Sequence, residues 1–137
     1  MYRNILVPVD LSDEETATRI LQLGKHLCAE GGTLTVVHVL PEIPTYVATY
    51  IPEDVKDSRG KEQREMLASL IDRAGLDDAA ARLTHGVPHL RILDMIDEIK
   101  PDLVIIGSHR PGMTDYFLGS TAARVVRHAD CSVLVDR

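Results

Sequence analysis

Short apolar segments constrain the fold of this chain more than any other feature of its sequence. Five segments are mainly apolar, at residues 4–9, 33–40, 81–85, 103–106 and 131–135, and three of them are almost continuously aliphatic. Continuous aliphatic runs, rather than strict alternation with polar residues, are typical of parallel strands that are covered on both faces. The sequence therefore predicts five short strands of a parallel sheet.

Apolar residues at helical spacing separate these strands. Four such stripes lie within residues 17–28, 66–74, 92–99 and 118–126. The first follows Ser12-Asp13-Glu14-Glu15, which matches a capping box with Ser12 as the N-cap. The second follows a charged segment, residues 53–65, so that its start is not fixed, and the third begins after Gly86-Val87-Pro88 and stops at Pro101.

Strands that alternate with helices specify a layered α/β domain, and we expect residues 1–137 to form one such domain. Right-handed crossovers leave few ways to wind the sheet, although the pattern alone leaves the strand order open. In such a sheet, ligands collect beyond the carboxyl ends of strands, where the winding reverses. The loops after Val9, Leu40, His85 and Ile106 are therefore the candidate binding loops.

Charge and composition exclude several classes of partner. The 15 basic and 21 acidic residues give a net charge of −6, without a basic run, which disfavours binding to nucleic acid. No apolar run approaches the roughly 20 residues of a membrane span, and no leader pattern precedes the first strand. We therefore expect a soluble, cytoplasmic protein. Cys28, on the first helical stripe, and Cys131 are expected to be small buried residues rather than a disulfide.

The segment after the fourth strand has the composition of a phosphate-binding site. Gly107 and Gly112 lie in the loop, and Gly119, Ser120 and Thr121 lie where the last helix is expected to begin. Glycine lets the backbone approach an anion closely, while the free amides and the dipole of the first helical turn favour negative charge. The sequence therefore predicts a cradle for phosphate.

An ordered set of motifs makes the chain resemble the universal stress protein family. The motifs are Pro8-Val9-Asp10, His38-Val39, Gly86-Val87-Pro88, Gly107-Ser108-His109 with Gly119-Ser120, and the ending from Val125 to Val135. No single motif suffices, but the set covers essentially the whole length. The resemblance implies a Rossmann-like three-layer sandwich with a parallel sheet of order 3-2-1-4-5, a homodimer, and ATP between the ends of the first and fourth strands.

The resemblance also implies roles for individual residues at the base end of a nucleotide. Asp10 would hydrogen-bond the ribose or the adenine, and the backbone of Val39 would meet the adenine edge. Pro8 and Val9 would form the floor of the pocket.

At the phosphate end, the implied contacts come from the two glycine-bearing segments. Gly107 would lie against the ribose and phosphates, and Gly119, Ser120 and Thr121 would offer amides and hydroxyls to the phosphate chain.

One feature departs from the family's nucleotide-binding pattern, which has a second glycine two residues after the first. This chain has Ser-His-Arg-Pro there, with eleven residues between Gly107 and Gly119, one fewer than in the pattern. The change could remove a backbone contact, or Gly112 could replace it while Arg110 and His109 contact the phosphates. The Ser-His-Arg-Pro motif itself resembles the corresponding motif of a subgroup of the family, and members of that subgroup are expected to bind adenine nucleotide.

These observations favour a stress-response protein that binds ATP, ADP or AMP as a regulator or sensor with an unknown protein partner. Whether Mg²⁺ accompanies the phosphates is left open. The alternatives are a slow ATP-hydrolysing or adenylyl-transferring enzyme, and a dimeric interaction module that has lost nucleotide binding.

No catalytic residue is predicted, because the chain lacks a Gly-x-Ser-x-Gly elbow, a His-Glu-x-x-His pair and a Walker lysine. No metal site is predicted either, because Gly86 and Pro88 interrupt the helix that His85 and His89 would need. Core or surface roles are favoured for His26, His38 and His128.

Two further segments point to contacts. In the order 3-2-1-4-5 the apolar strand Val133–Val135 would occupy a sheet edge, where two copies can pair as a closed dimer. The connection from Pro41 to Pro52 is unusually apolar for a surface loop. Its Tyr46 and Tyr50 could close over an adenine, form a partner surface or be buried against the charged helix, and the sequence does not decide among these.

Overall fold

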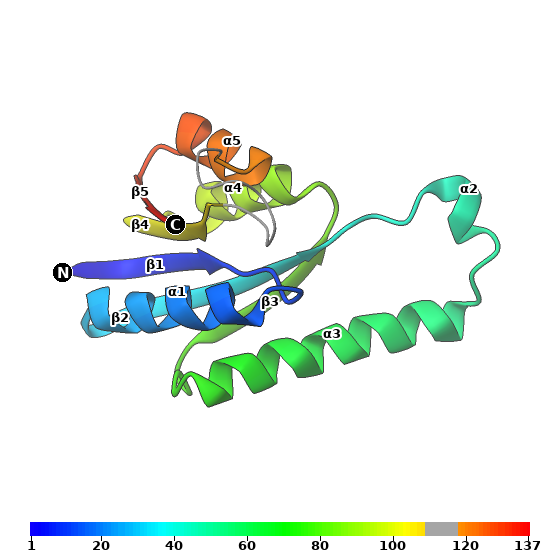
Figure 1. Ribbon diagram of the computed structural model, residues 1–137, viewed down its shortest axis with the longest axis horizontal. Helices are drawn as coiled ribbons and strands as arrows, with labels where there is room; N and C mark the ends of the chain where they lie inside the picture. Colours follow the sequence, from blue (N-terminus) through cyan, green and yellow to red (C-terminus); the bar gives the residue numbers. More distant parts are fainter. Residues whose placement is uncertain (109–117) are drawn as a thin grey trace.

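A parallel five-stranded sheet of order β3-β2-β1-β4-β5 forms the middle layer of the protein, as expected (Figure 1). The computed structural model describes residues 1–108 and 118–137. The strands are β1 (Tyr2–Pro8), β2 (Cys28–Leu40), β3 (Ala80–His85), β4 (Leu103–Gly107) and β5 (Ser132–Asp136). The helices are α1 (Glu14–Leu27), α2 (Thr45–Ala48), α3 (Glu53–Arg73), α4 (Pro88–Ile99) and α5 (Ser120–His128).

Two apolar layers hold the helices to the sheet. Successive residues of a strand point to opposite faces, so that Ile5 and Val7 pack with α1 and α3, while Leu6 packs with α4 and α5. All three side chains are fully buried, and such burial contributes roughly 1.5–3 kcal/mol for each large aliphatic side chain. Because both faces of β1 are covered, its sequence is a continuous apolar run rather than an alternating one.

Helix α1 begins one residue later than the capping-box pattern predicts. Its N-cap is Asp13, whose carboxylate accepts a hydrogen bond from the backbone N–H of Thr16 at 3.2 Å. The prediction of Ser12 as the cap is wrong, because Ser12 donates both its N–H and its hydroxyl to Oδ1 of Asp10. Ser12 therefore belongs to the turn before the helix.

The apolar stripe predicts that Cys28 lies on the first helix, and this prediction is wrong. Cys28 is the C-cap of α1 and the first residue of β2. β2 is thus longer than the predicted segment, since residues 28–32 extend it ahead of Thr33. Cys28 and Cys131 are both free thiols, as expected, but they are half-buried rather than buried. Desolvation, together with the nearby Asp130 carboxylate, raises the pKa of the Cys131 thiol, which keeps it protonated and weakly reactive.

Helix α3 is only partly attached to the rest of the molecule. Its carboxyl half buries Leu67, Leu70 and Ile71, whereas its amino half and α2 project beyond the carboxyl ends of the strands (Figure 1). Tyr46 and Tyr50 are 77% and 86% exposed, so that burial against the charged helix is excluded.

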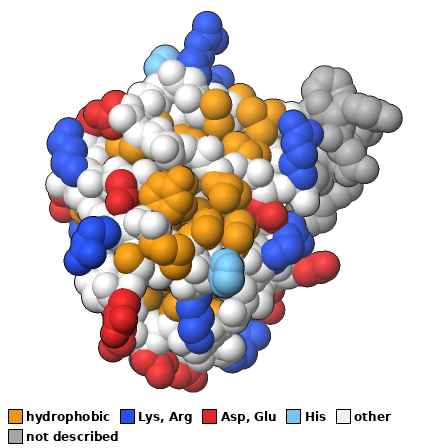
Figure 2. All heavy atoms as spheres, turned by 90° about the vertical axis from the view of Figure 1, so that its left-hand side faces the viewer, with side chains coloured by type: hydrophobic (Ala, Val, Ile, Leu, Met, Phe, Trp, Pro, Cys, Tyr) orange, Lys and Arg blue, Asp and Glu red, His pale blue; other side chains and the backbone are white. Residues whose placement is uncertain are grey.

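The other end of the molecule has a different surface. The face of the molecule at the amino-terminal end of β1 carries a group of hydrophobic side chains surrounded by charged ones (Figure 2). Among the helices of the described residues, none is long and apolar enough to cross a membrane.

Asp102 ties the start of β1 to the turn before β4. Its carboxylate accepts hydrogen bonds from the backbone N–H groups of Arg3 and Asn4, both at 2.9 Å, and these bonds lower its pKa below the ordinary value of 3.8. A lowered pKa in the folded state means that the carboxylate stabilises the fold above pH 3.8, and that this contribution disappears as the pH falls through the lower, folded value.

We therefore predict that Asp102→Asn lowers the urea midpoint of unfolding at neutral pH. The difference between variant and wild type should shrink as the pH falls below 3.8. Urea titrations across the acid range measure this difference. A midpoint difference that stays constant down to strongly acidic pH would contradict the role of the ionised carboxylate.

Candidate functional site

The site begins where two neighbouring strands separate. β1 pairs with β4 only through Ile5 and Leu6, although β1 continues to Pro8 and β4 to Gly107. The chain then leaves β1 for α1 on one face of the sheet, and β4 is followed by α5 on the other face. A cavity of about 820 Å³ lies at this separation, and its size is within the range of small-molecule sites.

The structure brings the predicted site residues together. Those in the described part of the chain all line this cavity, namely Pro8, Val9, Asp10, Val39, Gly107, Gly119, Ser120 and Thr121. The two remaining predicted residues, His109 and Arg110, lie outside the described residues.

The loop after β1 holds its acidic side chain in a fixed place. The N–H of Val9 donates to the carbonyl of Val37 at 2.8 Å, which extends the pairing of β1 with β2. Oδ1 of Asp10 then accepts from the N–H of Ser12 at 2.9 Å and from its hydroxyl at 2.6 Å. Leu11 between them is buried. Only one oxygen of the exposed Asp10 carboxylate is therefore engaged by the loop.

A buried histidine supports the same loop. Nδ1 of His38 lies 3.0 Å from the carbonyl oxygen of Val9, and because a carbonyl only accepts, Nδ1 carries the proton. His38 also lines the cavity. The expected core or surface role is thus confirmed as a core role, and the position of His38 at the carboxyl end of an aliphatic run, next to Val39, is the sequence signal that could have placed it at the cavity.

The end of β4 and the start of α5 form the opposite wall. Gly107 packs so closely on α1 that a Cβ there would lie 2.9 Å from Cγ2 of Thr16. The carbonyl of buried Ser108 accepts the N–H of Gly119, the N-cap of α5. The Gly119 amide is thus committed to the protein. The amides of Ser120 and the two residues after it are first-turn groups, which have no acceptor within a helix.

The charged side chains of the cavity come from two segments of the described chain. Asp10 and Asp13 bring carboxylates from the β1–α1 connection, and Arg59 brings a guanidinium from α3. Gln63 and Met66 of α3 line the same wall. Sequence reasoning missed these α3 residues because it left the helix start open within a charged segment. Within residues 1–108 and 118–137, no group of three His, Cys, Asp or Glu side chains is placed to hold a metal ion.

A parallel sheet of this order, with a cavity at the point where the winding reverses, defines a Rossmann-like α/β protein. The model of the universal stress protein family matches residues 1–137, and the chain belongs to that family. It is 31% identical over 143 residues to Universal stress protein G of Salmonella typhimurium, with complete coverage of both chains.

Solved structures have the same fold. One is a universal stress protein in complex with cAMP, with a TM-score of 0.73 and 23% identity over 99% of this chain and 97% of that one. Another is a universal stress protein from Archaeoglobus fulgidus in complex with dAMP, with a TM-score of 0.66 and 23% identity over 99% of this chain and 98% of that one.

The close packing of Gly107 on α1 gives a test of the cavity wall. Gly107→Ala should lower the free energy of unfolding by about 1–3 kcal/mol, because the new methyl group collides with Cγ2 of Thr16. Thr16→Ser removes that methyl, so that the double variant should recover most of the loss. Urea unfolding of the two single variants and the double variant measures the coupling. Strictly additive effects would show that the two residues do not meet as described.

Proposed function

We propose that this protein is a cytoplasmic stress-response protein that binds ATP, ADP or AMP and acts as a nucleotide-dependent regulator. The observation that carries the proposal is the convergence of Asp10, Val39, Gly107 and Ser120 on one cavity of about 820 Å³. These residues come from four separate segments, and their meeting at the reversal point of the sheet is what a nucleotide site requires. The relatives solved with cAMP and dAMP support an adenine nucleotide as the ligand.

The cavity walls match the two ends of a nucleotide. The base and ribose would lie beside Asp10 and the backbone of Val39, on the floor formed by Pro8 and Val9. The phosphates would lie against Gly107 and the first amides of α5, where the positive end of the helix dipole favours an anion.

The role of the nucleotide is that of a signal, with binding read by a partner protein, rather than that of a fuel. His109 and Arg110 would contribute to the phosphate contacts, as expected for the Ser-His-Arg-Pro subgroup. Any accompanying Mg²⁺ would be held mainly by the phosphates and water. Residues 1–137 would act as a single adenine-nucleotide-binding domain.

Calorimetric titration with ATP and with AMP tests this function. Saturable binding of at least one nucleotide is expected, and Asp10→Ala should weaken it by roughly 10- to 100-fold, because a hydrogen bond to a charged group contributes about 1.5–3 kcal/mol. Asp72→Ala is the matched control, since it removes an exposed carboxylate that does not line the cavity. If neither nucleotide binds at millimolar concentration, the protein is better explained as an interaction module.

A second copy of the chain is the proposed partner of β5. This strand pairs with β4 on one side, and it is last in the strand order. The Asp136 carbonyl faces β4, because it accepts the N–H of Ser108 at 2.8 Å. Backbone groups alternate between the two edges of a strand, so that those of Val133 and Val135 face outward. A strand at the end of a sheet favours pairing about a twofold axis.

Val133→Pro should convert the dimer to a monomer, because proline removes an outward N–H while leaving the bonds to β4 in place. Light scattering measures the mass, and circular dichroism verifies that the variant is folded. Leu134→Pro is the control, since it removes an N–H that faces β4 and should destabilise the fold itself. A folded Val133→Pro protein with a dimer mass would contradict pairing through this edge.

A further inference from the structure

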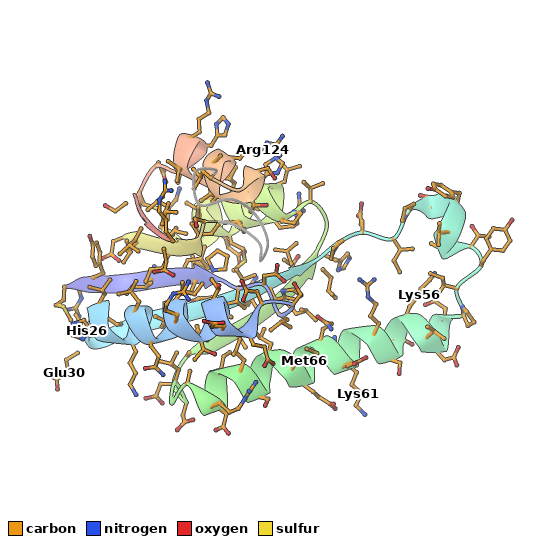
Figure 3. The ribbon with its side chains drawn as sticks, in the orientation of Figure 1. His26, Glu30, Lys56, Lys61, Met66 and Arg124 are labelled. Carbon is orange, nitrogen blue, oxygen red and sulfur yellow. The ribbon has the colours of Figure 1, made fainter. Side chains whose placement is uncertain are left out.

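One face of α3 continues past the point where the helix covers the core. Its buried residues include Leu67 and Leu70, and the same stripe continues towards the amino end through Met66, Gln63 and Arg59, which are all half-buried. In Figure 3, Met66 lies on the side of α3 that faces the sheet, whereas Lys61 points away from it. The carboxyl half of the stripe therefore packs on the sheet, and its amino half continues beyond the carboxyl ends of the strands.

The chemistry of this stripe changes where the sheet ends. Leucine gives way to methionine, then to glutamine, and then to arginine. An apolar stripe is sufficient to attach a helix to a core, so that packing does not explain the two polar members. Arg59, Gln63 and Met66 all line the cavity of the proposed nucleotide site.

The Arg59 side chain has its donors available. Within the described residues its guanidinium makes no hydrogen bond and no ion pair, whereas Arg19, Arg73 and Arg82 each pair with a carboxylate. Arg59 is also the one Lys or Arg side chain that lines the cavity in the described part of the chain. A half-buried guanidinium without a partner among residues 1–108 and 118–137 is suited to contact a ligand.

The location of α3 indicates which end of the ligand Arg59 would contact. α3 packs in the layer of α1 and contacts β3, whereas α5 packs on the opposite face of the sheet. β3 pairs with the end of β2, where Thr84 is opposite Val39. Arg59 therefore approaches the cavity from the Val39 side, away from the first amides of α5.

We propose that Arg59 is a base-contacting residue, and that its planar guanidinium stacks on the face of the purine. This inference rests on the proposed function, because it takes the Val39 side as the base end of the site. Guanidinium planes stack on aromatic faces and are more weakly hydrated than an ammonium group. A stacked arginine from α3 would close the outer side of the base, opposite the backbone of β2.

The test compares two nucleotides that share a base and differ in their phosphates. Arg59→Ala should raise the Kd of ATP and the Kd of AMP by the same factor, about 5- to 30-fold, as expected for the loss of a stacking contact. Arg59→Lys keeps the charge but not the plane, and should recover little of the affinity. Arg64→Ala is the matched control, because Arg64 is an exposed arginine of α3 that does not line the cavity. Thermal unfolding verifies that the variants are folded.

The outcomes separate this inference from the proposed function. A loss that is much larger for ATP than for AMP would place Arg59 on the phosphate chain and overturn the inference, as would full recovery by Arg59→Lys or an unchanged affinity in Arg59→Ala. In each of these cases wild-type binding stands, and so does the proposed function. A wild-type protein that binds neither nucleotide overturns both.

Discussion

The separation of β1 from β4 at their carboxyl ends is the constraint on which the rest of the site depends. The two strands pair only through Ile5 and Leu6 of β1 with the first two residues of β4, and each strand then leads towards a helix on a different face. A continuous ladder would close the space between them. Because the strands part, Asp10 and Gly107 lie on two sides of one cavity rather than along one strand edge.

Buried polar residues hold this opening in shape. His38 bonds to the carbonyl of Val9, and the carbonyl of Ser108 accepts the N–H of Gly119. Each bond contributes only about 1 kcal/mol net, but losing a partner would leave a buried polar group unsatisfied, at a cost of about 1–3 kcal/mol. Apolar side chains could fill the same space but could not fix the direction of a loop. Directional hydrogen bonds are therefore found at the opening, while the layers behind it are aliphatic.

The sequence allowed the fold class to be predicted because the signal is repeated along the chain. Each covered strand must be apolar on both faces, as Ile5 and Leu6 illustrate. The strand order came from the resemblance to a family, since aliphatic runs do not say which strands are neighbours. The α1 cap was placed one residue early because two hydroxyl or carboxylate caps, Ser12 and Asp13, compete there, and Asp10 captures the first.

Less of the site was predictable, and for a physical reason. Residues within a loop, such as Asp10, belong to motifs that can be recognised. Arg59 lies in a charged helix where each residue has a solvated surface role as its simplest explanation, and only the helical phase separates it from Lys61. That phase depends on where α3 begins, which was open because Val55 is the only aliphatic residue of the helix before Met66 and a single residue defines no stripe. His38 occupies the core position that a histidine in an aliphatic run indicates, but the sequence does not show that it also lines the cavity.

Within the proposed function, the arrangement of charge in the cavity determines which end of the ligand lies beside α5 and which part lies beside the β1–α1 connection. The protein carries a net charge of −6, so that an anionic ligand gains nothing from long-range attraction, and local donors must hold it. Those at α5 are backbone amides, which do not titrate. The carboxylates of Asp10 and Asp13 lie on the β1–α1 connection. If a phosphate group lay there instead of the sugar, these carboxylates would repel it. A ligand with a neutral, hydrogen-bonding middle and one anionic end fits this sequence of groups, and a nucleoside phosphate has that form.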